Sequence, residues 1–173
     1  MVSNIINNYY FPESHCRCSL LGNGNINDTY KIEFKDRSDK YVLQRVNASV
    51  FKDPYSIADT HSLLLSNIDE TGRGEAYSLA NLVPNIYGKN ITIDGSGDFW
   101  RLTSFIEDSY AISSVTNGWQ ALEAGRAYGW FLRYCSNFDP SRFKEAIKDF
   151  HKLSFRIDQF KDAIKNNVAG RKE

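Results

Sequence analysis

The sequence predicts an α+β fold in which a small antiparallel sheet precedes a mainly helical segment. Before residue 107, several short segments alternate apolar and polar side chains, which is typical of half-buried strands. Turn-forming residues follow these segments closely, so successive strands are expected to pair antiparallel. From about residue 108 onward, apolar residues recur every three or four positions, which is typical of amphipathic helices.

The first part of this fold is expected to be an antiparallel meander. Three segments have the strand pattern: Cys16–Leu21, Thr29–Phe34 and Tyr41–Val46. A glycine-rich turn, 22–25, separates the first two segments, and a polar turn, 35–39, separates the second and third. A short helix around residues 5–10 is expected before the meander.

One helix and two further strands complete the expected sheet. Asp53 followed by Pro54 is a typical helix start, and apolar residues then continue to a breaker at Gly72–Gly74. Strand-like residues resume in the segments 82–86, 91–93 and 99–103. Asp94–Gly97 is a strong hairpin signal. We therefore expect a five-stranded antiparallel sheet with one helix.

Helices are expected over the rest of the chain. The spacing predicts helices over 119–134 and 158–167, with a segment between them that starts at Asp139-Pro140. The aromatic residues of 119–134 are most simply interpreted as core. We place a boundary near Glu107, which divides the chain into a first lobe (1–107) and the start of a helical lobe (108–173).

Composition excludes several classes of function. The 173 residues contain 21 Lys+Arg and 21 Asp+Glu, and this balance argues against a nucleic-acid partner. No apolar run approaches the roughly 18–20 residues needed to cross a bilayer, and the amino terminus shows no secretory signal. We expect no membrane partner and a cytoplasmic location. His15-Cys16-Arg17-Cys18 lacks the second half of a four-ligand metal site, so alternate strand residues facing one side are the preferred interpretation.

The glycine-rich turn at Gly22 and Gly24 has two interpretations. It is either an ordinary hairpin turn or a loop whose backbone amides cradle phosphate oxygens. The order of elements favours the second, because protein-kinase-like enzymes place such a hairpin before a third strand and a helix. The third strand carries Gln44 where a kinase usually has Lys. Arg45 follows it and should point to the opposite face of the sheet.

Several motifs together resemble the N-acetylhexosamine 1-kinase group of the aminoglycoside-phosphotransferase and choline-kinase-like superfamily, whose relatives include proteins labelled mucin desulfatase. The matching segments of the first lobe are 22–30 (GNGNINDTY), 41–47 (YVLQRVN), Val50-Phe51, Trp100-Arg101 and Phe105–Glu107. Those of the helical part are Gly125–Gly129, Phe138-Asp139, Phe150-His151, Arg156 and Phe160. In Gln44 the chain agrees with the group.

The resemblance implies ATP-dependent phosphorylation of the anomeric hydroxyl of an N-acetylhexosamine, with Mg²⁺ bridging the phosphates. It also implies a set of nucleotide-binding residues, in which the glycine-rich loop covers the phosphates and the backbone after the last strand meets the adenine edge. These residues are Gly22, Asn23, Gly24, Asn25, Ile26, Asn27, Gln44, Ser104, Phe105, Ile106 and Glu107.

One motif that this chemistry requires is absent from the 173 residues. None of His15, His61 and His151 begins the H-x-D motif that supplies the catalytic Asp, and no metal-binding Asp can be assigned. We therefore expect an inactive amino-terminal fragment of a sugar kinase, whose exposed apolar helix faces meet a missing helical lobe or another copy. The alternatives are another small-molecule kinase of the superfamily, acting on choline, homoserine or an aminoglycoside, and a non-catalytic binding module or pseudokinase fragment.

Overall fold

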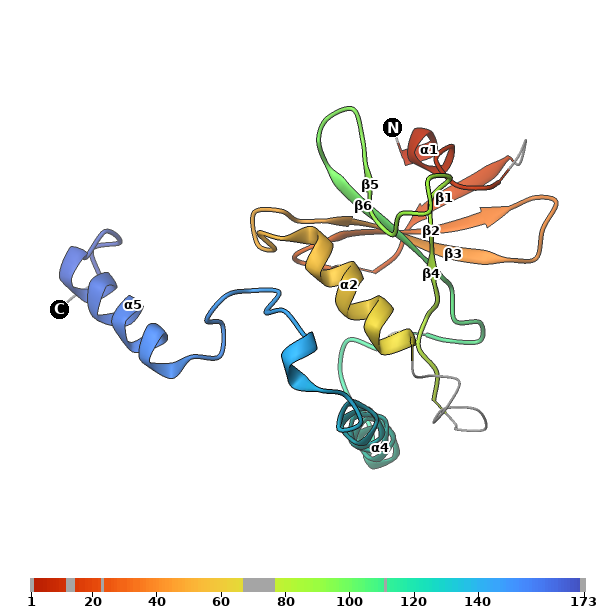
Figure 1. The fold of residues 1–173 in the computed structure, drawn as a ribbon. Coiled ribbons are helices and arrows are strands. Elements are labelled where there is room, and N and C mark those ends of the chain that lie inside the picture. The colour runs from red at the N-terminus through yellow and green to blue at the C-terminus, as the bar shows by residue number, and fades with distance from the viewer. Residues whose placement is uncertain (1, 12–14, 23, 67–76, 111, 172–173) are drawn as a thin grey trace.

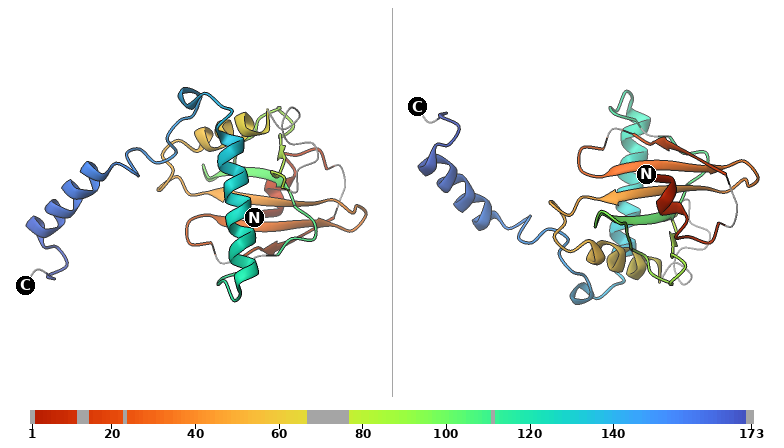
Figure 2. Two further views of the ribbon diagram at one scale, coloured as in Figure 1. Left: turned by 90° about the horizontal axis from the view of Figure 1, so that it is seen from below. Right: turned by 90° about the horizontal axis from the view of Figure 1, so that it is seen from above.

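The computed structural model describes residues 2–11, 15–22, 24–66, 77–110 and 112–171, and these form one antiparallel sheet with helices on both faces (Figures 1 and 2). The strands are β1 (Cys16–Leu20), β2 (Asp28–Phe34), β3 (Lys40–Val46), β4 (Leu82–Val83), β5 (Thr92–Ile93) and β6 (Phe99–Ser104). The helices are α1 (Val2–Ile6), α2 (Pro54–Leu65), α4 (Gly118–Cys135) and α5 (Leu153–Asn166), with a 3₁₀ turn η1 at Pro140–Arg142.

The predicted meander is confirmed. The strand order is β1-β2-β3-β6-β4, and all neighbours pair antiparallel. The register places Thr29 of β2 opposite Gln44 of β3, and Gln44 opposite Arg101 of β6. Because side chains directly opposite one another point to the same face of a sheet, these three residues form a row across three strands.

The expected count of five strands is wrong, because the described residues alone form a sheet of six. Both β4 and β5 pair with β6: Val83 lies opposite Leu102, and Thr92 lies opposite Trp100. Pro84, which has no amide hydrogen, ends β4 after two residues, and a turn then carries the chain to β5. The hairpin turn at Asp94 is confirmed, since its Oδ1 accepts hydrogen bonds from the backbone of Ser96 (2.8 Å) and Asp98 (3.0 Å).

The main core lies between the sheet and the amino-terminal segment. Ile32, Leu43 and Leu102 are fully buried and belong to a cluster with Ile5 and Ile6 of α1. Figure 2 shows α1 lying across this face of the sheet. Burial of each such side chain stabilises the fold by about 1.5–3 kcal/mol, so this short helix is held by its apolar contacts and not by its length.

The opposite face of the sheet carries α2 and α4, and the view from below in Figure 2 shows α4 crossing it. Asp53 caps α2 as predicted, with Oδ1 accepting from the backbone of Tyr55 (3.2 Å) and Ser56 (3.3 Å). The Tyr134 hydroxyl of α4 donates to the Leu64 carbonyl near the end of α2. The two faces therefore differ: one is sealed by apolar packing, while the other holds helices above polar side chains.

Several helix boundaries differ from expectation. Helix α1 lies at 2–6 where residues 5–10 were expected, and α2 ends at Leu65; the expected breaker at Gly72–Gly74 lies outside the described residues. The last helix starts at Leu153 and not at 158, because its apolar residues extend the helical spacing toward the amino terminus.

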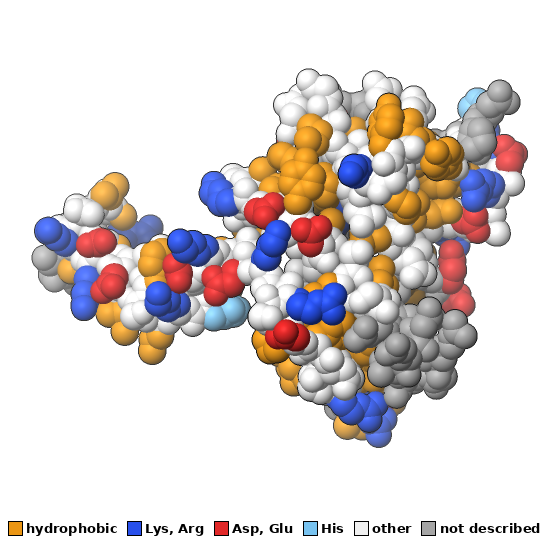
Figure 3. Space-filling model, in the orientation of Figure 1, with side chains coloured by type: hydrophobic (Ala, Val, Ile, Leu, Met, Phe, Trp, Pro, Cys, Tyr) orange, Lys and Arg blue, Asp and Glu red, His pale blue; other side chains and the backbone are white. Residues whose placement is uncertain are grey.

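The expectation that the aromatic residues of 119–134 form core is wrong for two of them. Trp119 and Tyr128 are each 64% exposed, while Tyr134 is buried. Helix α5 projects from the rest of the molecule (Figure 1), and apolar and charged side chains are interspersed along it (Figure 3). In the described part of the chain, no helix combines the length and apolarity that a membrane crossing requires.

Candidate functional site

The glycine-rich loop joins β1 to β2 and is closed at its base by a hydrogen bond from the Leu21 amide to the Thr29 carbonyl (2.8 Å). Gly22 has a φ of +73°, a conformation that L side chains rarely adopt. At Gly24, a Cβ would lie 3.0 Å from the Asn27 carbonyl oxygen, so the loop is tight there. Asn23, one of the predicted binding residues, lies outside the described residues.

An amide clamp fixes the second half of this loop to the end of β3. The Asn27 Oδ1 accepts from the Asn47 amide (2.9 Å), and Asn47 Nδ2 donates to the Ile26 carbonyl (3.1 Å). The Asn47 Oδ1 also accepts from the amide (3.0 Å) and hydroxyl (2.6 Å) of Ser49. Asn47 therefore links the loop, the third strand and the turn that leads to α2. Asn47 lies in one of the segments that match the kinase group, but no role was predicted for it.

Behind the loop, the row of Thr29, Gln44 and Arg101 is joined by side-chain hydrogen bonds. Gln44 Nε2 donates to Thr29 Oγ1 (3.1 Å). Gln44 Oε1 accepts from Arg101 Nε (3.0 Å) and Nη2 (2.8 Å). With its amide nitrogen on a hydroxyl and its oxygen on two cationic donors, the Gln44 side chain has one consistent orientation.

Arg101 is half-buried, and burial lowers the pKa of its guanidinium from the usual value. Within the described part of the chain, no carboxylate forms an ion pair with it. His61 of α2 is close enough for the charge of Arg101 to affect it. Burial, and secondarily this charge, lower the pKa of His61, whose Nε2 lies 2.8 Å from the Ala80 carbonyl oxygen. A neutral His61 therefore donates to Ala80 and adds no second charge near Arg101.

The other cations of β2, β3 and β6 have carboxylate partners. Lys31 Nζ lies 2.9 Å from Glu33, and Lys40 Nζ lies 2.6 Å from Glu107. Arg45 pairs with Asp28 and Asp98 on the opposite face, as expected for the residue after Gln44. Arg101 thus differs from its neighbours: its guanidinium faces an uncharged amide. Arg101 belongs to a segment that matches the kinase group, but its position opposite Gln44 was not predicted, because register across strands is not evident from one sequence.

The segment Ser104–Glu107 leaves the sheet at the end of β6 with its first backbone groups already bonded. The Ser104 amide donates to the Asn81 carbonyl (2.8 Å), and the Phe105 amide donates to the Lys40 carbonyl (3.0 Å). Lys31 Nζ lies 4.9 Å from the centre of the Phe105 ring. Since Ser104 pairs with Tyr41, three residues from Gln44 on the same strand, this segment lies about 10 Å along the sheet from Gln44.

The predicted binding residues therefore fall into three groups. The described residues of 22–27 form the loop, Gln44 lies behind it in the polar row, and Ser104–Glu107 lie further along the same pair of strands. Thr29 connects the base of the loop to Gln44, whereas Ser104 pairs with Tyr41, three positions along β3, so its side chain faces the other side of the sheet.

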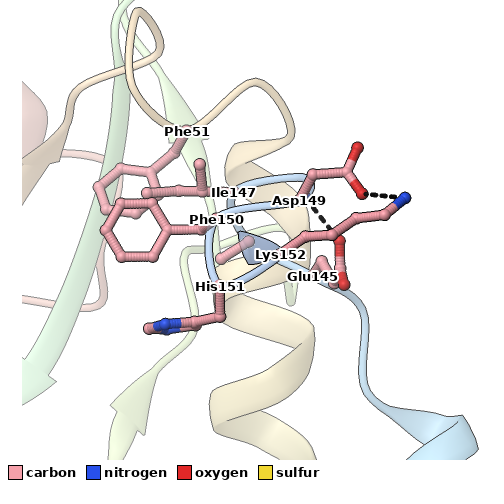
Figure 4. Close-up of a pocket in the computed structure, with 8 residues that line it drawn as sticks. Phe51, Glu145, Ile147, Asp149, Phe150, His151 and Lys152 are labelled. Atoms are coloured by element: carbon pink, nitrogen blue, oxygen red, sulfur yellow. Dashed lines mark hydrogen bonds and ion pairs between the residues drawn. The ribbon is translucent and has the colours of Figure 1, made fainter. Parts of the chain in front are cut away.

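One hollow lies away from these residues. It has a volume of about 570 Å³ and is lined by Phe51 and by residues 145–147 and 149–152. In Figure 4 the rings of Phe51 and Phe150 lie beside each other, and Asp149 pairs with Lys152. A smaller hollow of about 350 Å³ adjoins the glycine-rich loop and includes Ile26, Asn47 and Ser49. Neither hollow was predicted from the sequence, because each is lined by residues of separate segments.

The interpretation of Cys16 and Cys18 as alternate residues facing one side of a strand is confirmed. Both pack against the core cluster on the α1 face, with their Sγ atoms 3.9 Å apart. Burial, with a smaller contribution from Cys16, raises the pKa of Cys18 to about 11. The Cys18 thiol is therefore protonated near neutral pH and is a poor nucleophile.

Comparison with solved structures identifies the fold. A microcompartment-associated aminopropanol kinase superimposes with a TM-score of 0.63 at 14% sequence identity, over 83% of this chain and 43% of that one. A spectinomycin phosphotransferase, solved with ADP and spectinomycin, gives a TM-score of 0.46 at 12% identity, over 73% of this chain and 35% of that one. No model of a known protein family matches the sequence. The chain has a kinase-like fold and spans less than half the length of either structure.

Proposed function

We propose that this chain supplies the nucleotide-binding lobe and the first helices of the second lobe of an ATP-dependent small-molecule kinase. The observation that carries the proposal is the row of Thr29, Gln44 and Arg101, which starts at the base of the glycine-rich loop and crosses one face of a kinase-like sheet. In kinase-like enzymes the corresponding loop covers the nucleotide phosphates. We propose the lobe boundary near Glu107, where the chain leaves β6.

In this proposal ATP lies between the sheet and the helices that follow it. Residues 22–27 cover the phosphates, and the backbone of Ser104–Glu107 meets the edge of the adenine. Mg²⁺ binds together with the ATP phosphates and neutralises part of their charge. The described residues contain no group of three His, Cys, Asp or Glu side chains that could hold a metal, so no metal-binding role is assigned to them.

The proposed phosphate acceptor is the anomeric hydroxyl of an N-acetylhexosamine. Support for this substrate comes from the sequence resemblance of segments 22–30 and 41–47. An amino alcohol is a second candidate, because one protein with the same fold is an aminopropanol kinase. Both candidates require a catalytic Asp, and the 173 residues contain no H-x-D motif to provide one. We therefore propose that this chain alone does not transfer phosphate.

The first experiment is to sequence the DNA that follows codon 173, in all three frames. An H-x-D-x-x-x-x-N motif there supports an enzyme. The joined product, expressed as one chain, is then incubated with Mg-ATP and with N-acetylhexosamines, amino alcohols, choline, homoserine and aminoglycosides in turn. A ³¹P signal of a sugar 1-phosphate supports the proposed substrate, and a phosphorylated amino alcohol supports the second candidate. Failure of every acceptor contradicts the kinase proposal.

The 173-residue chain is assayed in parallel. The nucleotide cleft of kinase-like enzymes is formed by both lobes, so we expect weak binding of Mg-ATP and no turnover. Micromolar affinity by calorimetry, or sugar 1-phosphate formed by the pure chain, would contradict the proposal that it is part of an enzyme. The exposed apolar residues of α4 and α5, such as Trp119 and Phe160, are the proposed contact surface for the remaining helices or for a second copy.

A further inference from the structure

We infer that Arg101 is the residue that brings positive charge to the nucleotide phosphates, in the role that a lysine on the third strand has in other kinases. This inference rests on the proposed function. Of the pair Gln44 and Arg101, only Gln44 was predicted from the sequence, and the two residues have different roles. Arg101 contacts the ligand, and Gln44 is a positioning residue that holds the guanidinium in place.

Gln44 and Arg101 lie directly opposite each other on β3 and β6, so their side chains share one face of the sheet with Thr29, which lies at the base of the glycine-rich loop. A lysine at position 44 would extend from the same point of the sheet. The arginine reaches this region from the neighbouring strand instead, and its Nε and Nη2 converge on Gln44 Oε1.

Hydrogen bonds fix the orientation of the Gln44 amide. The bond from Gln44 Nε2 to Thr29 Oγ1 turns Gln44 Oε1 toward Arg101. Thr29 lies two residues after Asn27, at the base of the loop, so the same row connects the loop to the cation. An amide positions a guanidinium without neutralising it, whereas a carboxylate would form an ion pair and compete with an anionic ligand.

Arg101 differs from the other cations of these strands in its partner. Lys31, Lys40 and Arg45 each have a carboxylate within 3.0 Å, while Arg101 has the Gln44 amide. A half-buried cation without a counterion is unfavourable, and an anionic ligand on this face relieves that cost. Guanidinium groups match phosphate oxygens with two parallel hydrogen bonds, so a phosphate chain is the chemistry that fits.

The test is an NMR titration of the 173-residue chain, with ¹⁵N-arginine labelling to observe the Arg101 Nε–Hε signal. This measurement detects the weak binding that we expect of the chain alone. The probes are Mg-ATP, inorganic tripolyphosphate and adenosine. We expect the Arg101 signal to move with ATP and with tripolyphosphate, and to stay in place with adenosine. The backbone amides of Gly24 and Ile106 report nucleotide binding independently of Arg101.

Variants measure the energetic contribution. Arg101→Gln should weaken ATP binding about tenfold, as expected for loss of a hydrogen bond to a charged group, and Arg101→Lys should weaken it less. Arg45→Gln is the matched control, because it removes an arginine of β3 from the opposite face, and its affinity should stay within about twofold of the original, since surface ion pairs contribute little. The direct signal in the unsubstituted chain does not depend on whether a variant folds.

The outcomes separate this inference from the proposed function. If the Gly24 and Ile106 amides move with ATP while Arg101 does not, or if Arg101→Gln and Arg45→Gln weaken binding equally, the nucleotide site stands and the role of Arg101 is overturned. In that case Arg101 is a structural link between β3 and β6. If no signal moves with any nucleotide, both the proposed function and the inference are overturned.

Discussion

Gln44 of β3 accepts two hydrogen bonds at Oε1 from Arg101 of β6, at 3.0 Å from Nε and 2.8 Å from Nη2. The pair joins two central strands while leaving a full positive charge on the sheet face, because the amide is neutral. β3 therefore has Gln44 where kinases usually have a lysine, but Arg101 still provides a positive charge on this face. Substitutions at position 44 change the charge balance in known directions.

Gln44→Glu should stabilise the fold and weaken nucleotide binding. The new carboxylate would pair with Arg101, and charge-assisted hydrogen bonds are stronger than neutral ones, so we expect a gain of about 1 kcal/mol in the free energy of unfolding. ATP binding should fall because Arg101 is then neutralised by the protein. Urea unfolding and ATP titration measure the two effects.

Gln44→Lys should change the free energy of unfolding in the opposite direction to Gln44→Glu. It brings a second cation against Arg101, so we expect the free energy of unfolding to fall by about 1–2 kcal/mol. If Gln44→Glu lowered stability as much as Gln44→Lys did, the side chain at position 44 would not interact with the charge of Arg101. That result would contradict the hydrogen bonds between the two residues.

Asn47→Ala should loosen the glycine-rich loop. It removes the Nδ2 bond to the Ile26 carbonyl and the Oδ1 contacts with Ser49, at an expected cost of about 1 kcal/mol because these groups are partly exposed. Hydrogen exchange at Gly24 to Asn27 should become faster than in the unsubstituted chain. Asn25→Ala, an exposed asparagine in the same loop, is the control. Equal exchange rates in both variants would show that the clamp does not order the loop.

The fold was predictable to the extent that it depends on local pattern. Alternation at β2 and β3, the Asp53 cap and the Asp94 turn all depend on residues close together in the sequence, and the structure confirms them. Among the described residues, β4 and β5 fall in the strand-like segments 82–86 and 91–93, but the expected count of five strands missed that both of them pair separately with β6, which only the register across strands shows.

The glycine-rich loop of the candidate site was predictable from the sequence, whereas the position of its positive charge, Arg101, was not. Gly22 and Gly24 are recognisable as a turn, whereas the Arg101–Gln44 contact joins positions 57 residues apart. Such a contact requires the register of β3 against β6. Likewise, Trp119 and Tyr128 have the composition of core residues, and composition alone does not state which helix face the described chain covers.

Stability should fall as the pH is lowered through the range just below that of ordinary histidine. Burial lowers the pKa of His61 in the folded chain, so the unfolded state takes up a proton at a higher pH than the folded state does. The unfolded state therefore gains relative stability as the pH falls below about 6.5, until the folded His61 is itself protonated. Urea midpoints measured from pH 7.5 downward test this expectation.

His61→Gln is the informative variant for this pH dependence. Its amide nitrogen could still donate to the Ala80 carbonyl, but the side chain does not titrate. The fall in stability over this range should therefore become shallower than in the unsubstituted chain. An unchanged profile would assign the pH dependence to other groups.

Tyr134→Phe should remove one hydrogen bond between α4 and α2. The Tyr134 hydroxyl donates to the Leu64 carbonyl, which lies in the last turn of α2, where carbonyls have no partner within the helix. Loss of this bond should lower the free energy of unfolding by about 1 kcal/mol, since the aromatic ring and its packing remain. Trp130 stacks on Tyr134, with 5.4 Å between ring centres, so its fluorescence reports the region directly. Tyr128→Phe, on the exposed side of the same helix, should change stability by less than about 0.5 kcal/mol. Equal losses in both variants would mean that this hydroxyl does not hold α4 against the sheet-bearing part of the chain.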